Sequence, residues 1–533
     1  MSFTQKSIPI DETKLFTKLI CDFSHSNPNL NSLLCDFPSL NSVKQSIRTV
    51  NNKCRVDLVS VLKEQYNATS FNDCTTKHVD ENIIKILEHN SYTITTGHQL
   101  NIFASPLFLI YKIITVLAYA RYLNHHIKNH HCIPCFWMAS EDHDFEEINK
   151  VKIYNKNFHW DRTDPNRAVG TLPSKSILPI LDDIKTILFN TSFGKQLYQL
   201  YDNSFNNNVL YSDAMRSLLT CFFHDFGLVI IDGNHKKLKR MFIYDFELEI
   251  RKSIVFKSVT KTNKLIRKQY KPHINALISN IFYLSSSIRD KIQYDGKHYF
   301  SHVHQKKWLQ KELIEEIREF PENFSPNVFL RTLYQQRIMP NVLYIGGPSE
   351  ISYWLQLKDV FNQMNIQFPI LQLRSFFLIL SNKQANFLNK YQLSIDDVFL
   401  STDDKIKKIL LKLDKVKSEN FNQELDVFLS AVREKINCID GFNLSAFGAF
   451  EKKIKREVKK IDDKILRTHK LNNKHILEAV HNLDMQLFPN HNPQEKINSF
   501  IPFFMKYGHS FFQLLIQESS VFDNKYIILT EKS

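Results

Sequence analysis

Short apolar segments alternate with helical segments between residues 91 and 364, and this alternation constrains the fold more than any other feature. The apolar segments have the length and the β-branched or aromatic content of buried strands. We predict strands at 92–95, 133–139, 228–231 and 342–345. Helical segments lie between them, the longest from about Pro106 to Asn124, and another follows from Glu350 to about Met364. Because parallel strands are joined by helical crossovers, the pattern predicts an α/β protein with a doubly wound parallel sheet.

The N-terminal sequence and the apolar runs indicate where in the cell the protein is located. Residues 1–16 carry charges where a signal peptide would need an apolar stretch. The longest apolar run, 107–120, is interrupted by Lys112 and is too short to span a bilayer. We therefore predict a cytoplasmic protein with no membrane partner.

Eight cysteines are scattered along the chain. In a cytoplasmic protein we expect reduced thiols, many of them buried as small apolar side chains. Cys132 and Cys135 form the one close pair, which could be a redox motif or, with His130 and His131, half of a zinc site. No second cluster in the sequence supplies the remaining ligands, so packing is the favoured interpretation and no metal site is predicted.

Basic residues outnumber acidic residues by 69 to 55, which gives a formal net charge of +14. Such an excess attracts phosphates, carboxylates or nucleic acid. Much of it lies in residues 236–271 and 452–460, and in the second segment the charges alternate with apolar residues at helical spacing. This spacing is typical of a solvated helix face, so the net charge does not by itself indicate a nucleic-acid partner.

Changes in composition along the chain divide it into seven segments. We predict N-terminal helices and the first half of the core at 1–150, an insertion at 151–215, a core strand region at 216–235, a mixed α/β insertion at 236–325, the second half of the core at 326–382, an antiparallel coiled-coil arm at 383–486, and a C-terminal segment that packs on the core at 487–533. A small β structure is expected around Asp295-Gly296, and a strand is expected at 526–530.

Heptad spacing supports the predicted arm. Apolar residues recur at steps of three and four in residues 406–416 and again in residues 447–465. Asp440-Gly441 lies between the two stretches and predicts a hairpin of two antiparallel helices. Because such a hairpin cannot bury its stripe on every side, we expect either a homodimer through the arm or packing of the arm onto the core.

The first unusual loop, Thr96-Gly97-His98-Gln99, follows a predicted strand. Ligands of open α/β sheets bind outside the carboxyl ends of the strands. Gly97 lets the backbone approach a ligand, and the amides that follow point at anions. His98 can donate to a phosphate or transfer a proton near neutral pH. The alternative is a capped turn with a surface histidine.

The second loop carries five carboxylates around one histidine. It comprises Glu141, Asp142, His143 and Asp144, with Glu146 and Glu147 beyond them. This concentration of like charge is costly. It suits a substrate ammonium group, a Mg²⁺ ion or a general base for an amine nucleophile. An acidic helix N-terminus stabilised by the helix dipole is the alternative.

The third loop opens a predicted helix. It contains Gly346, Gly347, Ser349 and Glu350, whose successive amides form an anion nest for a carboxylate or phosphate. Tyr353 and Trp354 follow on the helix and could stack on a base or sugar, although aromatic residues at such positions more often belong to the core.

Together these loops resemble those of the bacillithiol biosynthesis cysteine-adding enzyme family. The matching stretches are TGHQ at 96–99, Pro106-Leu107, Tyr111-Lys112, FWMASEDHDFEE at 136–147, NFSPNVFLR at 323–331, GGPSEISYW at 346–354 and LFPN at 487–490. They occur in family order and span most of the chain. The chain departs from the family pattern at His98, where glutamine is expected, and at Thr332, where proline is expected.

The resemblance implies a Rossmann-like core with connecting insertions and a coiled-coil arm that forms a homodimer. It also implies an enzyme that joins cysteine to glucosaminyl-malate by an amide bond. Asp142, His143 and Asp144 are then the expected catalytic residues. The loops at 96–99 and 346–354, with Lys112, Glu141 and Arg331, are expected to bind substrate or nucleotide. ATP and Mg²⁺ are candidate cofactors, although no Lys-Met-Ser-Lys-Ser loop typical of class I synthetases occurs in the sequence.

Two other functions stay open. A nucleotidyl- or aminoacyl-transferase that acts on RNA is favoured by the basic charge, and it predicts salt-dependent RNA binding. A non-catalytic coiled-coil scaffold predicts no ligand-dependent rise in melting temperature. The acidic loop argues against the scaffold, because a scaffold has no use for so many clustered carboxylates.

Overall fold

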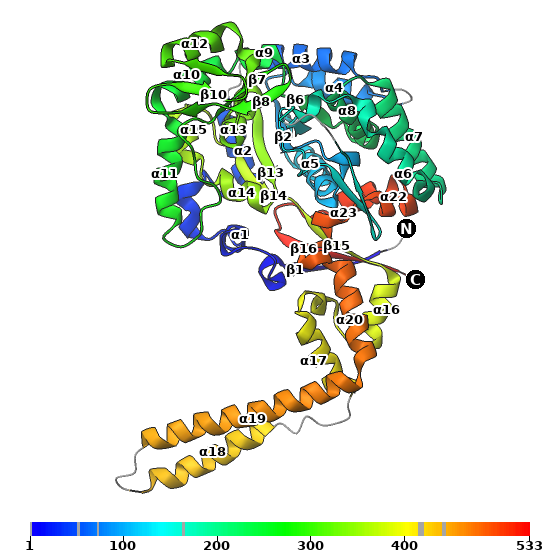
Figure 1. Cartoon of the computed structure of the whole chain (residues 1–533), viewed down its shortest axis with the longest axis vertical. Coiled ribbons are helices and arrows are strands. Elements are labelled where there is room, and N and C mark those ends of the chain that lie inside the picture. The colour runs from blue at the N-terminus through cyan, green and yellow to red at the C-terminus, as the bar shows by residue number, and fades with distance from the viewer. Residues whose placement is uncertain are drawn as a thin grey trace.

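The computed structural model describes residues 3–50, 54–71, 74–161, 166–413, 421–439 and 444–532. Figure 1 shows an α/β body from which a long helical arm projects. Both termini lie at the side of the body from which the arm leaves.

A five-stranded parallel sheet forms the centre of the body. Its strands, in spatial order, are β14 (Ile370–Leu373), β13 (Asn341–Gly346), β2 (Ser91–His98), β3 (His131–Met138) and β6 (Val229–Asp232). Each neighbouring pair is parallel. The prediction of a doubly wound parallel sheet is confirmed, with β14 as a strand that we did not predict. The chain order reverses between β2 and β13, and this is the switch point at which such sheets bind ligands.

Helix α5 (Leu107–His126) connects β2 to β3 and is apolar on nearly all sides because the fold surrounds it. In the part of the chain that the structure describes, it is the one helix long and apolar enough to cross a membrane. However, 78% of its most apolar window is buried inside the protein. Its apolar character is therefore explained by its position in the core.

The cysteines only partly follow the prediction. Cys132 and Cys135 lie in β3 and are buried, and burial raises the pKa of Cys132 to about 12. This position confirms the packing interpretation of the pair. Cys74 and Cys221 form a disulfide between the segment before α4 (Lys77–Lys85) and helix α8 (Tyr211–Phe223). The prediction that all the cysteines are reduced is wrong for these two.

The N-terminal segment and the insertions surround the sheet. The N-terminal helices are α1 (Lys18–Ser24), α2 (Leu40–Thr49), α3 (Arg55–Ala68) and α4. The first insertion contains the hairpin β4 (Lys150–Ile153) and β5 (Lys156–His159) and the helices α6 (Leu178–Leu188), α7 (Ser192–Asn207) and α8.

The segment predicted as the second insertion contains both helices and strands. Its helices are α9 (Lys236–Arg240), α10 (Ile243–Lys252), α11 (Ile254–Ile266) and α12 (Gln310–Glu319). The expected β structure consists of β7 (Ile281–Ser285), β8 (Ile288–Lys291), β9 (Gln293–Tyr294), β10 (Tyr299–Ser301), β11 (Lys306–Trp308) and β12 (Phe324–Pro326). Strands β12, β7 and β8 form a small antiparallel sheet.

A second sheet joins the two ends of the chain. Strand β16 (Lys525–Glu531) lies between β1 (Phe3–Pro9) and β15 (Phe376–Leu380). It pairs antiparallel to β1 and parallel to β15. The predicted strand at 526–530 is thus confirmed. Helices α21 (Gln494–Ile497), α22 (Ile501–Tyr507) and α23 (Ser510–Glu518) precede it.

The helices of the arm differ from the predicted pair. Helices α18 (Phe421–Asn437) and α19 (Leu444–Asn472) pack together as the hairpin in Figure 1. The stretch that begins at Ile406 belongs to α17 (Thr402–Leu413), which packs mainly on α20 (Lys474–Leu487) at the base of the arm. The prediction that this stretch pairs with residues 447–465 is therefore wrong. Val416 and Asp440-Gly441 lie outside the described residues.

Candidate functional site

A cavity of 1290 Å³ opens at the carboxyl ends of β2, β3 and β13, at the switch point of the sheet. All three loops singled out in the sequence contribute to its wall. The predicted residues that line it are Gly97, His98, Gln99, Lys112, Glu141, Asp142, His143, Asp144, Arg331, Gly347, Ser349, Glu350 and Tyr353. Thr96, Gly346 and Trp354 do not line it. The parallel strands thus bring distant loops to one edge.

Lys112 connects the first and third loops. It reaches from α5 and donates to the Gly97 carbonyl oxygen at 2.9 Å and to Nδ1 of His98 at 3.2 Å. Its Nζ also lies 2.6 Å from Oε2 of Glu350. The Lys112 side chain is only 3% exposed, so this ammonium group is held by the protein itself.

Glu350 fixes the start of the third loop. It lies in the first turn of α14 (Pro348–Trp354), where its Oε2 accepts from the Gly347 amide at 2.8 Å. Its Oε1 accepts from the Tyr344 hydroxyl at 2.8 Å. A carboxylate at this position caps the helix, and its negative charge interacts favourably with the positive end of the helix dipole.

The two aromatic residues of α14 face different surroundings. Tyr353 lines the cavity. Trp354 is fully buried, and its ring packs 4.5 Å from that of Tyr344 and 5.6 Å from that of Phe361. Ser349 opens the helix at the cavity wall. The structure thus places Trp354 in the hydrophobic core and leaves Tyr353 as the aromatic residue of α14 that can face a ligand.

Asp142 is the most constrained acid of the second loop. Its Oδ2 accepts from Gln99 at 2.9 Å, and its Oδ1 lies 3.4 Å from Nη1 of Arg289. Burial opposes the charge of this carboxyl group, but Arg289 and Arg331 outweigh burial and hold its pKa below the usual value. Asp142 is therefore ionised at neutral pH.

The other acids of this loop differ in their partners. Glu141 forms an ion pair with the buried Lys239 of α9, at 2.5 Å between Oε1 and Nζ. Asp144 is exposed at the cavity rim. Among the described residues, no group of three or more histidine, cysteine, aspartate or glutamate side chains could hold a metal ion.

Arg289 is a site residue that the sequence analysis missed. It comes from β8 in the second insertion, and its guanidinium donates to Ser325 Oγ, to the Pro326 carbonyl and to Nδ1 of His143, at 3.0, 2.9 and 3.2 Å. The guanidinium also stacks on Phe282, 3.8 Å from the ring centroid. No motif surrounds Arg289 in the sequence, so only the fold reveals its place.

Two further arginines line the cavity. Arg374 follows β14 and forms a buried ion pair with Glu495 of α21, so the C-terminal part of the chain supports the cavity wall. Arg331, in α13 (Val328–Ile338), forms no ion pair with any residue that the structure describes. Its charge nevertheless acts on the nearby carboxylates of Asp142 and Glu350.

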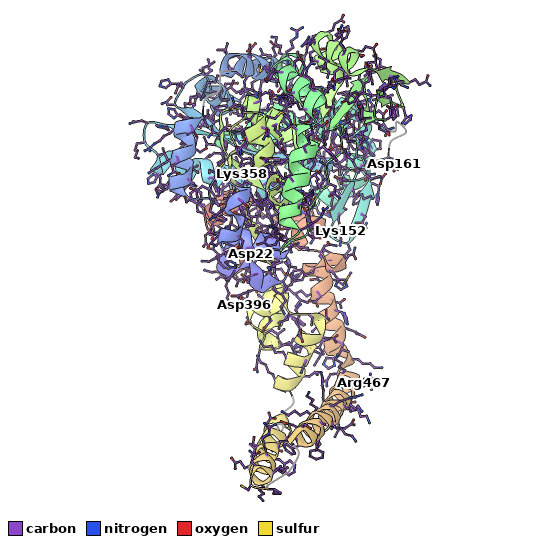
Figure 2. The ribbon with its side chains drawn as sticks, turned by 90° about the vertical axis from the view of Figure 1, so that its left-hand side faces the viewer. Asp22, Lys152, Asp161, Lys358, Asp396 and Arg467 are labelled. Atoms are coloured by element: carbon purple, nitrogen blue, oxygen red, sulfur yellow. A yellow bond between two sulfur atoms is a disulfide. The ribbon has the colours of Figure 1, made fainter. Side chains whose placement is uncertain are left out.

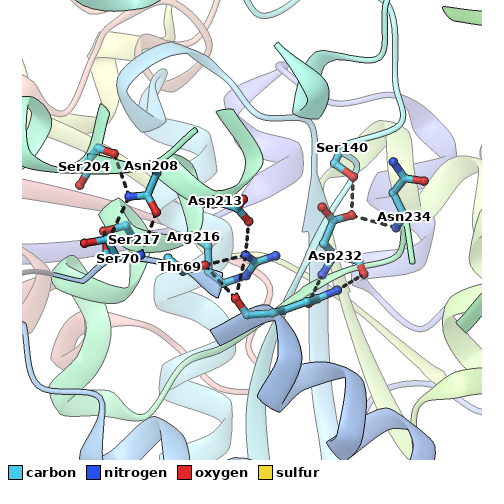
Figure 3. Close-up of polar contacts among 11 residues, drawn as sticks. Thr69, Ser70, Ser140, Ser204, Asn208, Asp213, Arg216, Ser217, Asp232 and Asn234 are labelled. Carbon is cyan, nitrogen blue, oxygen red and sulfur yellow. Dashed lines mark hydrogen bonds and ion pairs between the residues drawn. The ribbon is translucent and has the colours of Figure 1, made fainter. Parts of the chain in front are cut away.

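A polar network fixes the base of the second loop (Figure 3). Ser140, at the start of the loop, donates to the Asp232 carboxylate at the end of β6, and the Asn234 amide donates to the same carboxylate oxygen at 2.8 Å. Gln65 of α3 donates to the Asp232 carbonyl at 2.7 Å. These hydrogen bonds hold the start of the acidic loop against the end of β6.

Comparisons with known proteins identify related sequences. Residues 3–375 match the family model described as bacillithiol biosynthesis BshC, N-terminal Rossmann-like domain, and residues 377–531 match the corresponding C-terminal coiled-coil domain. A relative named "Putative cysteine ligase BshC" from Flavobacterium johnsoniae is 32% identical over 97% of both chains. Relatives of the same name from Christiangramia forsetii and Bacillus cereus (strain ZK / E33L) are 30% and 26% identical. The match to the Christiangramia forsetii relative covers 98% of both chains. The match to the Bacillus cereus relative covers 96% of this chain and 97% of the relative.

Proposed function

Because the chain belongs to the bacillithiol biosynthesis BshC family, we propose that it is a ligase that adds cysteine to glucosaminyl-malate. The bond formed is an amide between the cysteine carboxyl group and the glucosamine amine. A free carboxylate does not acylate an amine at neutral pH, so the cysteine carboxyl must carry a leaving group. ATP with Mg²⁺ is the candidate source of that group.

The observation that carries this proposal is the meeting of an acidic loop and the buried Arg331 guanidinium in one cavity. Asp142 and Asp144, with His143 between them, offer carboxylates for the amine in its charged form and for the proton that it releases. Arg331 offers a charge partner for a substrate carboxylate or phosphate. A substrate with an amine and acidic groups matches both.

The two glycine-containing loops supply the remaining contacts of the proposal. The amides at 96–99 are assigned to the leaving group, and Gly346, Gly347 and Ser349 are assigned to the malate carboxylates or a phosphate. Each loop follows a strand at the switch point of the sheet, where backbone amides can face an anion.

We further propose that the protein acts in the cytoplasm as a homodimer, with small molecules as its only substrates. The paired helices α18 and α19 carry large apolar side chains that are exposed in one protomer, among them Phe428, Phe450 and Ile461. Burial of these side chains in a second copy would stabilise a dimer. A transferase that acts on RNA is the second candidate function, supported by the net charge of +14.

The test is product formation by the purified protein supplied with cysteine, glucosaminyl-malate, ATP and Mg²⁺, followed by mass spectrometry. We expect the cysteinyl amide, and we expect Asp142→Ala to lower its rate by about 100-fold or more while the protein stays folded. Asp183→Ala, which removes an exposed carboxylate on α6, is the matched control and keeps the wild-type rate.

A strain that lacks the gene provides the complementary test. Loss of bacillithiol with accumulation of glucosaminyl-malate, restored by the wild-type gene and not by the Asp142→Ala gene, is the expected result. Unchanged bacillithiol in such a strain would refute the ligase assignment. RNA binding that weakens steeply with salt in a gel-shift titration would then favour the transferase.

A further inference from the structure

His98 has an unusual environment in the cavity. Its Nδ1 faces the ammonium group of the buried Lys112, at 3.2 Å. Lys112 also donates to the Gly97 carbonyl oxygen, so its position does not depend on a ligand. This arrangement determines where the imidazole carries its proton.

The three protons of the Lys112 ammonium group match three acceptors. These are the Gly97 carbonyl, Nδ1 of His98 and the Glu350 carboxylate. Burial lowers the pKa of Lys112, but Glu350 opposes this effect, and its carboxylate at 2.6 Å favours the charged amine. An ammonium group can only donate, so Nδ1 of His98 must accept. The neutral ring then carries its proton on Nε2.

The surrounding charges keep His98 neutral. Burial, followed by the charges of Lys112, Arg331 and Arg374, holds its pKa well below 6.5. Glu350, the carboxylate that pairs with Lys112, is thereby already neutralised. No residue in the described part of the chain bonds to Nε2 of His98, and the side chain lines the cavity.

We propose that His98 is a neutral Nε2–H hydrogen-bond donor to an anionic oxygen of the substrates, and that Lys112 is the positioning residue that fixes this tautomer. The oxygen belongs to a carboxylate or to a phosphoryl group. A histidine that acts as a base needs a free lone pair on Nε2, which would place the N–H of Nδ1 against a cation. The proposal deepens the ligase assignment above and rests on it only for the identity of the substrates.

Substitution by glutamine separates donation from proton transfer, because the glutamine amide can donate but cannot take up a proton. We expect His98→Ala to lower kcat/KM by about 100-fold, and His98→Gln to stay within about tenfold of wild type. A His98→Gln variant that is as inactive as His98→Ala, with an unchanged melting temperature, would overturn the proposal.

A ligand-free measurement keeps this test independent of the reaction. Nitrogen-15 NMR of histidine-labelled protein, with the His98 resonances assigned from the His98→Gln variant, is expected to show an Nε2–H imidazole at pH 7. Protonation at Nδ1, or at both nitrogens, would overturn the proposal even if no product forms. Titration calorimetry of wild type and His98→Ala with cysteine, glucosaminyl-malate and Mg-ATP in turn shows whether the oxygen is a carboxylate or a phosphoryl oxygen. The correct tautomer in a protein without ligase activity would refute the proposed function alone.

Discussion

At the residue scale, the burial of His98 makes the free energy of unfolding depend on pH. Its pKa lies well below 6.5 in the folded protein, chiefly because of burial. Below pH 6.5 the unfolded chain therefore binds a proton that the folded chain does not, and the free energy of unfolding falls as the pH falls. One such proton corresponds to a slope of at most about 1.4 kcal/mol per pH unit.

We expect His98→Gln to lose less stability than wild type between pH 8 and pH 5.5, measured by urea unfolding at each pH. His159→Gln replaces an exposed histidine on β5 and serves as the control, with the pH dependence of wild type. An identical slope in wild type and His98→Gln would contradict the inferred neutral state of this imidazole.

The residues of the site were predictable where they follow strands. The carboxyl ends of parallel strands meet at one edge, so the loops after β2, β3 and β13 could be expected together from the sequence. Arg289 and Arg374 could not, because their partners lie 147 and 121 residues away in the chain. Trp354 is the reverse case, a predicted site residue that lies in the core. Its position in the sequence does not reveal which of the two it faces.

At the element scale, β16 is the strand on which the second sheet depends. Its side chains alternate between two hydrophobic clusters, with Ile528 in one and Ile527 and Leu529 in the other. We expect Ile527→Ala and Ile528→Ala each to lower the free energy of unfolding by about 2–5 kcal/mol. Lys525→Ala, at the exposed start of the strand, should change it by less than about 0.5 kcal/mol. A large effect for only one isoleucine would mean that only one face of β16 is buried.

Elements were predictable from the sequence when their own pattern specified them. The apolar run at 526–530 predicted a strand, but its pairing with β1 and β15 depends on contacts between the ends of the chain. In the arm, the heptad pattern predicted helices but not their partners. Ile406 and Ile409 pack in the same cluster as Ile476 and Val480, so the apolar stripe of α17 is buried at the base of the arm.

At the scale of the whole molecule, the proposed homodimer rests on the exposure of apolar side chains on the arm. In Figure 2, Arg467 marks the part of α19 that projects away from the body. Phe428, Phe450 and Ile461 are 56%, 47% and 54% exposed in this arm. Ion pairs such as Arg433–Glu451 and Lys455–Asp426 join α18 to α19 but leave these apolar side chains uncovered. Because soluble proteins seldom leave such a stripe in water, a second copy of the arm is the simplest cover.

We expect the combined Phe450→Asp and Ile461→Asp variant to convert a dimer into a monomer at micromolar concentration. Two carboxylates in an apolar interface would weaken it by at least about 100-fold, because each loses hydration without gaining a partner. Light scattering coupled to gel filtration measures the change, and circular dichroism checks that the helices persist. Lys452→Asp and Lys453→Asp, exposed positions on the same helix, form the matched control and leave the dimer intact. A wild-type protein that is monomeric at these concentrations would instead mean that the arm serves another partner, and the cavity, formed within one protomer, would remain complete without a dimer.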